Sequence, residues 1–235
     1  VYATSCSSAF VEAFNGTITN CAAFGGSIIV PTGHSGGFIS CSQGTIYIEN
    51  CFTYLNCYGK EAVGSFFGSI ENGNITVKNC YTSGVVEGVE GMGGFAGSVE
   101  CYSTPMYPEF TLNTTVNMEN CYSTSTVGIN KQGKEMGSFI GRARQKTAKD
   151  VSENITVTLK NCYGAGEVGD TDTLVGATDH VAADLVGGFW GGESKATLSF
   201  QDCYYDKQTT AMREWASGSS REVPGITGVL TTKTE

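Results

Sequence analysis

Residues 75–97 read ITVKNCYTSGVVEGVEGMGGFAG and contain one complete copy of a pattern that the chain repeats. An alternating apolar run ends in Asn-Cys-Tyr, a short second piece follows, and a glycine-bounded phenylalanine closes the copy. Alternation of apolar and polar residues is typical of a strand with one buried face, and glycines between such runs indicate turns. One copy therefore predicts three short strands and no helix.

The same two elements recur in fixed alternation along the chain. Copies of the Asn-Cys element, with Asp for Asn in the last one, contain Cys21, Cys51, Cys80, Cys121, Cys162 and Cys203. Copies of the glycine-bounded element contain Phe38, Phe66, Phe95, Phe139 and Phe189. Units of roughly 29 to 41 residues are too small to bury an apolar face alone, so they must stack on one another.

Three-stranded units stack most naturally as a β-solenoid, with a step of about 4.8 Å between neighbours. We expect an all-β fold, a right-handed parallel β-helix of about six rungs, in a single domain over residues 1–235. Residues 1–14 would form an N-terminal cap, 15–205 the repeats and 206–235 a C-terminal cap. Caps are needed because an open end of the stack exposes unpaired strand edges.

The repeated positions also have predicted roles. The phenylalanines would form a buried ladder, and their flanking glycines would supply positive φ or close backbone approach. The Asn before each Cys would lie at a corner, with its amide bonded to neighbouring rungs. The register cysteines would stack as buried thiols, because rungs about 4.8 Å apart exceed the roughly 3.8 Å between Cβ atoms of a relaxed disulfide. Disulfides, if present, would involve the off-register cysteines Cys6, Cys41, Cys57 and Cys101.

Alternation of GG(F/L)xG with I-x-V-x-NCY-(S/T) over about residues 15–205 resembles the GLUG repeat. The tail, YYDKQTTAMREWASG followed by GITGVLTT, resembles the segment that closes such arrays. GLUG repeats occur in large secreted or wall-attached bacterial surface proteins and in non-catalytic regions of some immunoglobulin-A metallopeptidases. The resemblance implies an extracellular, adhesin-like β-helix that belongs to a larger surface protein.

Composition narrows the classes of partner. The formal net charge of −9 makes the chain a poor nucleic-acid binder. No apolar run approaches the roughly 18 residues that a membrane helix needs, so we expect no direct membrane insertion. Because the chain begins with Val and no signal-peptide pattern follows, we expect a mature or excised fragment, and we expect it to be a monomer.

Two sequence motifs match catalytic or cofactor-binding patterns but lack the helix that those patterns require. GHSGG at 33–37 satisfies G-x-S-x-G, but a nucleophile elbow requires a helix after the serine, and a glycine-bounded phenylalanine follows instead. GAGEVG at 164–169 satisfies G-x-G-x-x-G, but no helix begins there to hold a phosphate. The chain has no C-x-x-C pair, and His34 and His180 are far apart in sequence. We therefore expect no catalytic residues, no cofactor and no metal.

Two consecutive middle repeats are longer than the others at the same corner. The extra residues fall at 99–110 and 142–149, and they should emerge side by side, as insertions on a binding face do. The first is rich in aromatic residues and the second is basic, which predicts either a solvated loop or a charged rim beside an aromatic centre. The predicted binding residues are Tyr102, Met106, Tyr107, Phe110, Arg142, Arg144 and Lys146.

The preferred function is a binding or adhesion module of a bacterial surface protein. It would engage a host protein or a glycan, and the company of the GLUG family makes a host immunoglobulin a particular candidate. One alternative is a purely structural spacer that lifts another domain off the cell wall. The other is a carbohydrate-active β-helix enzyme, which would place Asp, Arg or Lys on one exposed face of adjacent rungs.

Overall fold

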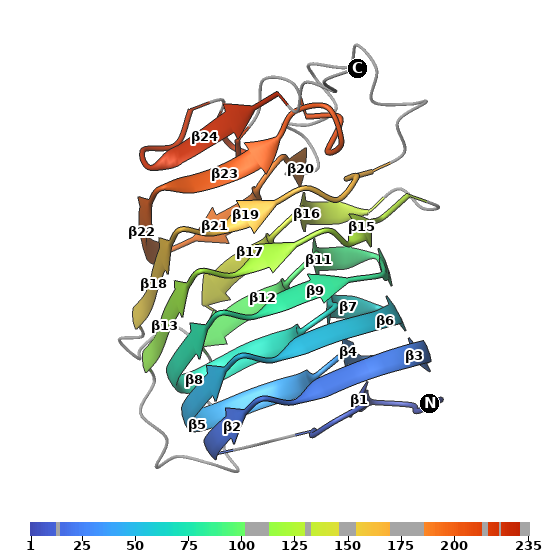
Figure 1. The fold of residues 1–235 in the computed structure, drawn as a ribbon. Helices are drawn as coiled ribbons and strands as arrows, with labels where there is room; N and C mark the ends of the chain where they lie inside the picture. Colours follow the sequence, from blue (N-terminus) through green and yellow to red (C-terminus); the bar gives the residue numbers. More distant parts are fainter. Residues whose placement is uncertain are drawn as a thin grey trace.

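The computed structural model describes residues 1–12, 15–101, 113–129, 133–145, 154–169, 186–212, 216–220 and 222–230. These residues form an all-β fold of parallel sheets, one of them strongly curled, which confirms the predicted class. Figure 1 shows the repeats one above another, from β2 near the N-terminus to β24 near the C-terminus. No helix that could cross a membrane occurs in the described part of the chain.

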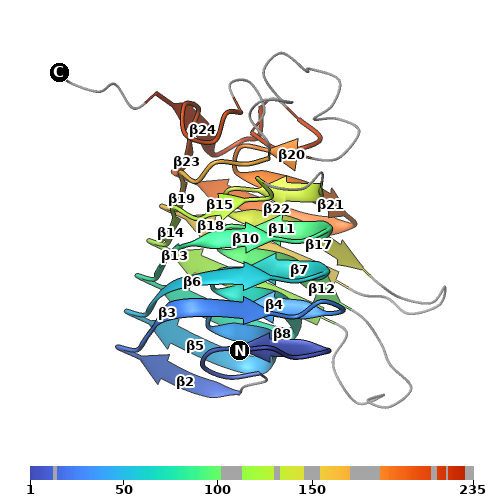
Figure 2. The same ribbon diagram turned by 90° about the vertical axis from the view of Figure 1, so that its right-hand side faces the viewer.

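Sheet 1 contains β1 and the five strands that precede the glycine-bounded phenylalanines, in the order β1-β4-β7-β11-β16-β20. Figure 2 shows β4, β7 and β11 one above another along one side of the stack. The strands are β1 (Cys6–Ser8), β4 (His34–Gly36), β7 (Glu61–Gly64), β11 (Glu90–Gly93), β16 (Lys134–Gly137) and β20 (Val186–Gly187).

Sheet 2 has the order β21-β17-β12-β8-β13-β18-β22, with β5 paired to β8 and β2 to β5. It contains the strands on both sides of the corner where the long repeats differ from the short ones. The strands are β2 (Gly16–Thr19), β5 (Ile39–Glu49), β8 (Phe67–Lys78), β12 (Ala96–Cys101), β13 (Asn113–Glu119), β17 (Ile140–Gln145), β18 (Asn154–Lys160), β21 (Trp190–Ser194) and β22 (Ala196–Gln201).

Sheet 3 contains the aromatic residues that follow Asn-Cys, in the order β15-β10-β6-β9-β14-β19-β23-β24, with β3 paired to β6. The strands are β3 (Ala22–Ile29), β6 (Phe52–Tyr58), β9 (Tyr81–Ser83), β10 (Val85–Glu87), β14 (Tyr122–Ser123), β15 (Thr126–Val127), β19 (Tyr163–Gly164), β23 (Cys203–Asp206) and β24 (Ile226–Val229). β24 pairs in parallel with β23 and is the last strand of the sheet.

Equivalent residues of successive repeats pair with one another. Ile75, for example, pairs with Ile46 on one side and Val116 on the other. A shift of one residue would turn each buried apolar side chain outward, so the alternating pattern fixes this register.

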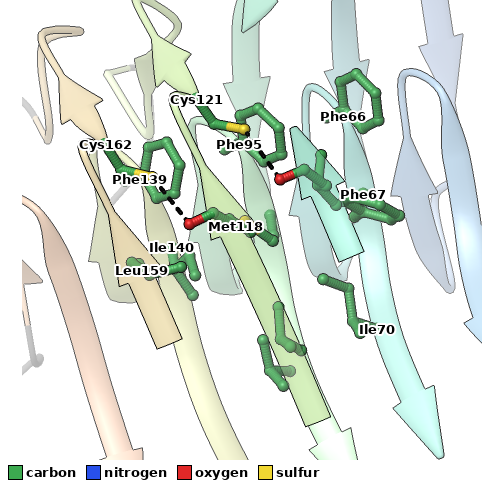
Figure 3. Close-up of a cluster of buried hydrophobic side chains, with 14 of the residues drawn as sticks. Phe66, Phe67, Ile70, Phe95, Met118, Cys121, Phe139, Ile140, Leu159 and Cys162 are labelled. Carbon is green, nitrogen blue, oxygen red and sulfur yellow. Dashed lines mark hydrogen bonds between the residues drawn. The ribbon is translucent and has the colours of Figure 1, made fainter. Parts of the chain in front are cut away.

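The phenylalanine ladder predicted from the repeats is present. Its five rings are fully buried, and successive ring centroids lie between 4.7 Å and 5.0 Å apart. Figure 3 shows Phe66, Phe95 and Phe139 beside one another, with Cys121 and Cys162 nearby. Burying each ring is worth about 1.5–3 kcal/mol, so the ladder is a major part of the core.

The predicted roles of Asn and Cys are also confirmed. Asn79 and Asn120 have φ of 51° and 54°, and the Asn120 side-chain amide donates to Asn79 Oδ1 at 3.1 Å. The thiol of Cys162 is buried and donates to the carbonyl of Met118 in the preceding repeat (Figure 3). All ten cysteines lie among the described residues and are free thiols in this structure.

The glycines beside the phenylalanines allow close backbone approach, and those of sheet 1 do not adopt positive φ. A Cβ on Gly64 would collide with the carbonyl of Phe67 and the amide of Gly97, and a Cβ on Gly93 would meet Gly141 in the same way. Sheet 1 therefore lies directly against the first half of sheet 2. Polar side chains between these two sheets range from fully buried to partly exposed, and they form the site described next.

Candidate functional site

The two long repeats leave and rejoin the stack at paired positions. β12 ends at Cys101 and β17 at Gln145, and these two residues are register partners. β13 begins at Asn113 and β18 at Asn154, which are also partners, and the Asn154 amide donates to Asn113 Oδ1 at 3.3 Å. In the preceding repeat β8 passes this corner without a break, with Asn72 at φ 38°. The predicted insertions therefore start and finish at neighbouring places.

Five of the predicted binding residues lie outside the described residues: Tyr102, Met106, Tyr107, Phe110 and Lys146. Arg142 and Arg144 are described, and both belong to strand β17. Arg142 is fully buried, whereas the Arg144 side chain is 25% exposed. The prediction that Arg142 lies in an exposed basic rim was wrong. The chain is still paired with β12 as far as Gln145, and Arg142 points between the two sheets.

Arg142 and Arg144 belong to a row of polar side chains that runs between sheets 1 and 2, buried at Arg142 and Glu100 and partly exposed at Glu90, which we call the polar seam. Its members are Cys6, His34, Cys41, Glu61, Glu71, Glu90, Ser98, Glu100, Glu135, Arg142 and Arg144.

Arg142 is the centre of the seam. Its Nε donates to Ser98 Oγ at 3.1 Å, its Nη2 to the fully buried Glu100 at 3.0 Å, and its Nη1 to Glu135 at 2.9 Å. Burial lowers the pKa of Arg142, but the charges of Glu100, Glu135 and Glu90 outweigh it, so that the pKa lies above its ordinary value. The guanidinium is therefore a permanent, paired charge that holds strands of both sheets together.

Glu61 connects this arginine cluster to the N-terminal end of the seam. Its Oε2 accepts a hydrogen bond from Arg144 Nη2 at 3.4 Å, and its Oε1 lies 3.6 Å from His34 Nε2. The other ring nitrogen of His34, Nδ1, lies 3.4 Å from Cys41 Sγ and 3.6 Å from Glu71 Oε1. The imidazole thus has a carboxylate on each side and a thiol beside it.

Cys6, His34 and Cys41 meet at this end although Cys6 and Cys41 are 35 residues apart in sequence. Cys6 pairs with His34 across β1 and β4, and Cys41 lies in β5 just after the phenylalanine turn. The ligand atoms of the three residues lie within 4.8 Å of one another. Short ligand spacings do not reveal this cluster, because residues stacked in adjacent repeats are separated in sequence by the length of a repeat.

The two thiols of the cluster are joined by a hydrogen bond of 3.5 Å from Cys41 Sγ to Cys6 Sγ. This bond and the charge of His34 lower the pKa of Cys6 to about 6. The same bond, together with burial, raises the pKa of Cys41. A lowered pKa favours the thiolate of Cys6, the form of cysteine that binds metals.

The aromatic residues after Asn-Cys form a second ladder on the outer surface of sheet 3. The Phe52 and Tyr81 rings lie 4.9 Å apart at 1°, and those of Tyr81 and Tyr122 lie 5.0 Å apart at 3°. Tyr122 is 42% exposed. Because each ring covers the face of the next, this row presents mainly edges and hydroxyls to solvent. This row therefore does not present open aromatic faces on which a sugar could stack.

The G-x-S-x-G motif is part of the fold and not a nucleophile elbow. Ser35 is fully buried in β4, and Gly36 and Gly37 pack against the backbone of Ile39 and Ser65. The serine is followed by a turn and not by a helix, as the sequence around GHSGG predicts.

No family model, no curated protein and no solved structure matches the chain.

Proposed function

We propose that the chain is a right-handed parallel β-solenoid of about six coils and that it acts as a binding module of a bacterial surface protein of the GLUG-repeat type. The parallel, in-register pairing of equivalent residues supports the solenoid, as do the ladders of Phe and Asn. β1 would close one end of the stack and β24 the other. The expected setting is extracellular, on the cell surface or secreted.

The observation that carries the binding role is the paired departure of two neighbouring repeats from the stack. Cys101 pairs with Gln145 and Asn113 with Asn154, so the segments between them are anchored side by side. Adjacent insertions on a regular repeat scaffold are where such proteins bind partners. We propose that Tyr102, Met106, Tyr107, Phe110 and Lys146 contact a host protein, with an immunoglobulin as the first candidate, or a glycan.

The polar seam supplies a rigid base for this edge. Arg142 and Arg144 lie in β17 immediately before the second insertion, and both reach Glu100 of β12 immediately before the first, at 3.0 Å and 3.3 Å. Strands fixed in this way hold Cys101 and Gln145, where the described strands end, in a constant relative position, and a preorganised base lowers the entropy lost on binding. In this proposal Arg142 supports the binding edge and does not contact the partner.

The experiment compares the chain with variants in which one insertion is replaced by the short corner of the preceding repeat. Glu71 pairs with Glu100 and Asn74 with Thr115, so residues 101–114 can be exchanged for Asn-Gly, the pair found at 72–73. The same exchange applies to residues 145–155. Binding is measured by surface plasmon resonance against purified mammalian secretory immunoglobulin and on a glycan array.

The proposal expects at least a tenfold loss of binding in each exchange, with thermal unfolding still cooperative. The control is Tyr54→Ser, which removes an aromatic side chain that is 62% exposed on sheet 3, away from the insertions, and should bind normally. Unchanged binding in both exchanges would refute the proposed edge. Absence of binding by the unaltered chain to every probe would favour the spacer function.

The carbohydrate-active alternative is the weaker one. The seam does gather carboxylates from adjacent repeats, but Glu61, Glu90, Glu100 and Glu135 all lie within 3.5 Å of Arg142 nitrogens. These carboxylates are engaged by a guanidinium, whereas the paired carboxylates of a glycosidase flank the scissile bond of the substrate. We therefore propose a module without catalytic activity.

A further inference from the structure

We propose that Cys6, His34, Cys41 and Glu71 bind one divalent metal ion of the zinc type at the N-terminal end of the polar seam. This site is separate from the insertion edge, and it does not depend on the binding function proposed above. Two thiols, an imidazole and a carboxylate are the donor types that zinc sites use, and four such donors satisfy a tetrahedral ion.

The distances between the donor atoms fit such an ion. Zn–S bonds of about 2.3 Å and Zn–N bonds of about 2.0–2.1 Å place two tetrahedral sulfur ligands about 3.8 Å apart, and sulfur and nitrogen about 3.6 Å apart. In this protein Cys6 Sγ and Cys41 Sγ are 3.5 Å apart, and Cys41 Sγ and His34 Nδ1 are 3.4 Å apart. Cys6, His34 and Cys41 are the three residues whose ligand atoms all lie within 4.8 Å of one another, and Glu71, whose Oε1 lies beside this group at 3.6 Å from His34 Nδ1, is the residue that we assign as the fourth donor.

The groups around the four donors match the outer shell of a metal site. Histidine ligands usually donate their second N–H to a carboxylate, and ligating carboxylates accept a further hydrogen bond. Glu61 Oε1 lies 3.6 Å from His34 Nε2 and is placed to take that role. Gln43 Nε2 donates to the second oxygen of Glu71 at 3.2 Å.

The cluster forms where the stack begins, and the same column changes in later repeats. The register partners of Cys41 along sheet 2 are Ser69, Ser98 and Arg142, so soft donors give way to hydroxyls and then to a guanidinium. A metal ion at Cys41 would tie β1, which has three residues, to β4 and β5. A disulfide would account for the approach of the two thiols, but not for an imidazole and a carboxylate that converge on the same place.

The test uses the full chain, reduced with a phosphine and stripped of metal with a chelator. Zinc affinity is measured by competition with a chromogenic chelator, and Co²⁺ serves as a spectroscopic probe. We expect one zinc ion per chain, thiolate-to-cobalt charge transfer with the intense visible bands of tetrahedral Co²⁺, and a higher Tm with zinc than without. Zinc X-ray absorption should show two sulfur and two nitrogen or oxygen neighbours.

Variants test the individual ligands. Cys41→Ser and His34→Gln should each weaken zinc binding by at least about 100-fold, whereas Cys21→Ser, which alters another partly buried thiol, should leave it unchanged. Glu61→Gln should weaken it by about 10–100-fold, as loss of a second-shell carboxylate does. Glu90→Gln is the matched control, because Glu90 contacts the same two arginines as Glu61 and should not alter zinc affinity.

Several results would overturn the proposal. These are failure of the reduced chain to bind zinc, a cobalt spectrum without thiolate bands, or binding that survives both ligand substitutions. A Cys6–Cys41 disulfide in the isolated protein, with no zinc uptake after reduction, would show that the pair is a redox couple instead. If the ligand variants do not fold, the cobalt spectrum and X-ray absorption of the unaltered chain decide the question.

Discussion

Replacing Arg142 by methionine should strongly destabilise the protein, and the effect should depend on Glu100. Both side chains are fully buried, and their closest charged atoms lie 3.0 Å apart. Methionine retains much of the apolar stem but removes the guanidinium, which leaves the Glu100 carboxylate inside the protein without its main partner. Removing one member of a buried ion pair costs about 3–5 kcal/mol, because the remaining charge is uncompensated.

The remaining contacts of Glu100 place the expected cost within that range. Glu100 keeps a hydrogen bond from Ser98 Oγ at 2.7 Å and one from Arg144 Nε at 3.3 Å. These lessen the penalty, so we expect Arg142→Met to lower the free energy of unfolding by about 3 kcal/mol. Glu100→Gln leaves Arg142 with its other carboxylates, and it should cost about 2 kcal/mol, the value of one charged hydrogen bond.

The assay is equilibrium urea denaturation of the two single variants and the double variant, followed by far-ultraviolet circular dichroism. The double variant removes both charges together, so it should be about 1–3 kcal/mol more stable than the sum of the single effects predicts. A cost below about 1 kcal/mol for Arg142→Met, or strict additivity, would refute the description of this pair as a buried, coupled element of the seam.

Three further predictions concern the repeat itself. Phe95→Ala removes the central ring of the buried ladder and should lower the free energy of unfolding by about 4 kcal/mol in urea denaturation. A cost near 1 kcal/mol would mean that the rings do not form a close-packed ladder. Gly93→Ala should lower the free energy of unfolding by at least about 3 kcal/mol, because the added Cβ meets backbone atoms. Gly25→Ala should cost about 1 kcal/mol in the same assay, because Gly25 has φ 81° but open space around it. Equal costs for the two variants would contradict the close approach of the two sheets. Burial raises the pKa of Cys57 to about 12, so Cys57 should resist iodoacetamide at pH 8 until the protein unfolds. The partly exposed Cys21 should react in the native state. Mass spectrometry of the modified protein that finds Cys57 modified first would contradict this prediction.

The repeated part of the fold could be predicted because every copy carries the same information. Phe95 and Asn120 have equivalents in several repeats, and equivalent residues of stacked units must meet. The class of fold, the phenylalanine ladder, the left-handed Asn corners and the buried thiols followed from this argument alone. What the glycines do was predicted only as two possibilities, and the structure shows close approach between sheets for those before each phenylalanine in sheet 1.

The polar seam could not be predicted because it occupies positions where the repeats differ. Cys41, Ser69, Ser98 and Arg142 lie in one register column but share no residue type, so no consensus marks the column. Their burial depends on how closely sheets 1 and 2 approach, which is a tertiary property. Arg142 was therefore assigned to an exposed loop on the evidence of neighbouring basic residues, although its strand continues to Gln145.

The cluster of Cys6, His34 and Cys41 could be predicted from the sequence only in part. Cys6 and Cys41 could be singled out from sequence as off-register cysteines, and the structure brings their sulfur atoms together. Alignment of the repeats would also have shown that His34, seven residues before Cys41, is on the facing strand of the same repeat. Predicting the cluster required the register of β1 with β4, and the short sequence of β1 contains no repeat motif to fix it.

The most direct test of the stacked architecture is the order of ring contacts along the phenylalanine ladder in solution. Nuclear Overhauser spectra of the chain with labelled phenylalanine, assigned by single Phe→Leu substitutions, report which rings lie within about 5 Å of one another. We expect contacts that join Phe38 to Phe66, Phe66 to Phe95, Phe95 to Phe139 and Phe139 to Phe189 in that order. Contacts that skip a member, such as Phe38 with Phe139, or the absence of contacts between successive members, would contradict this expectation.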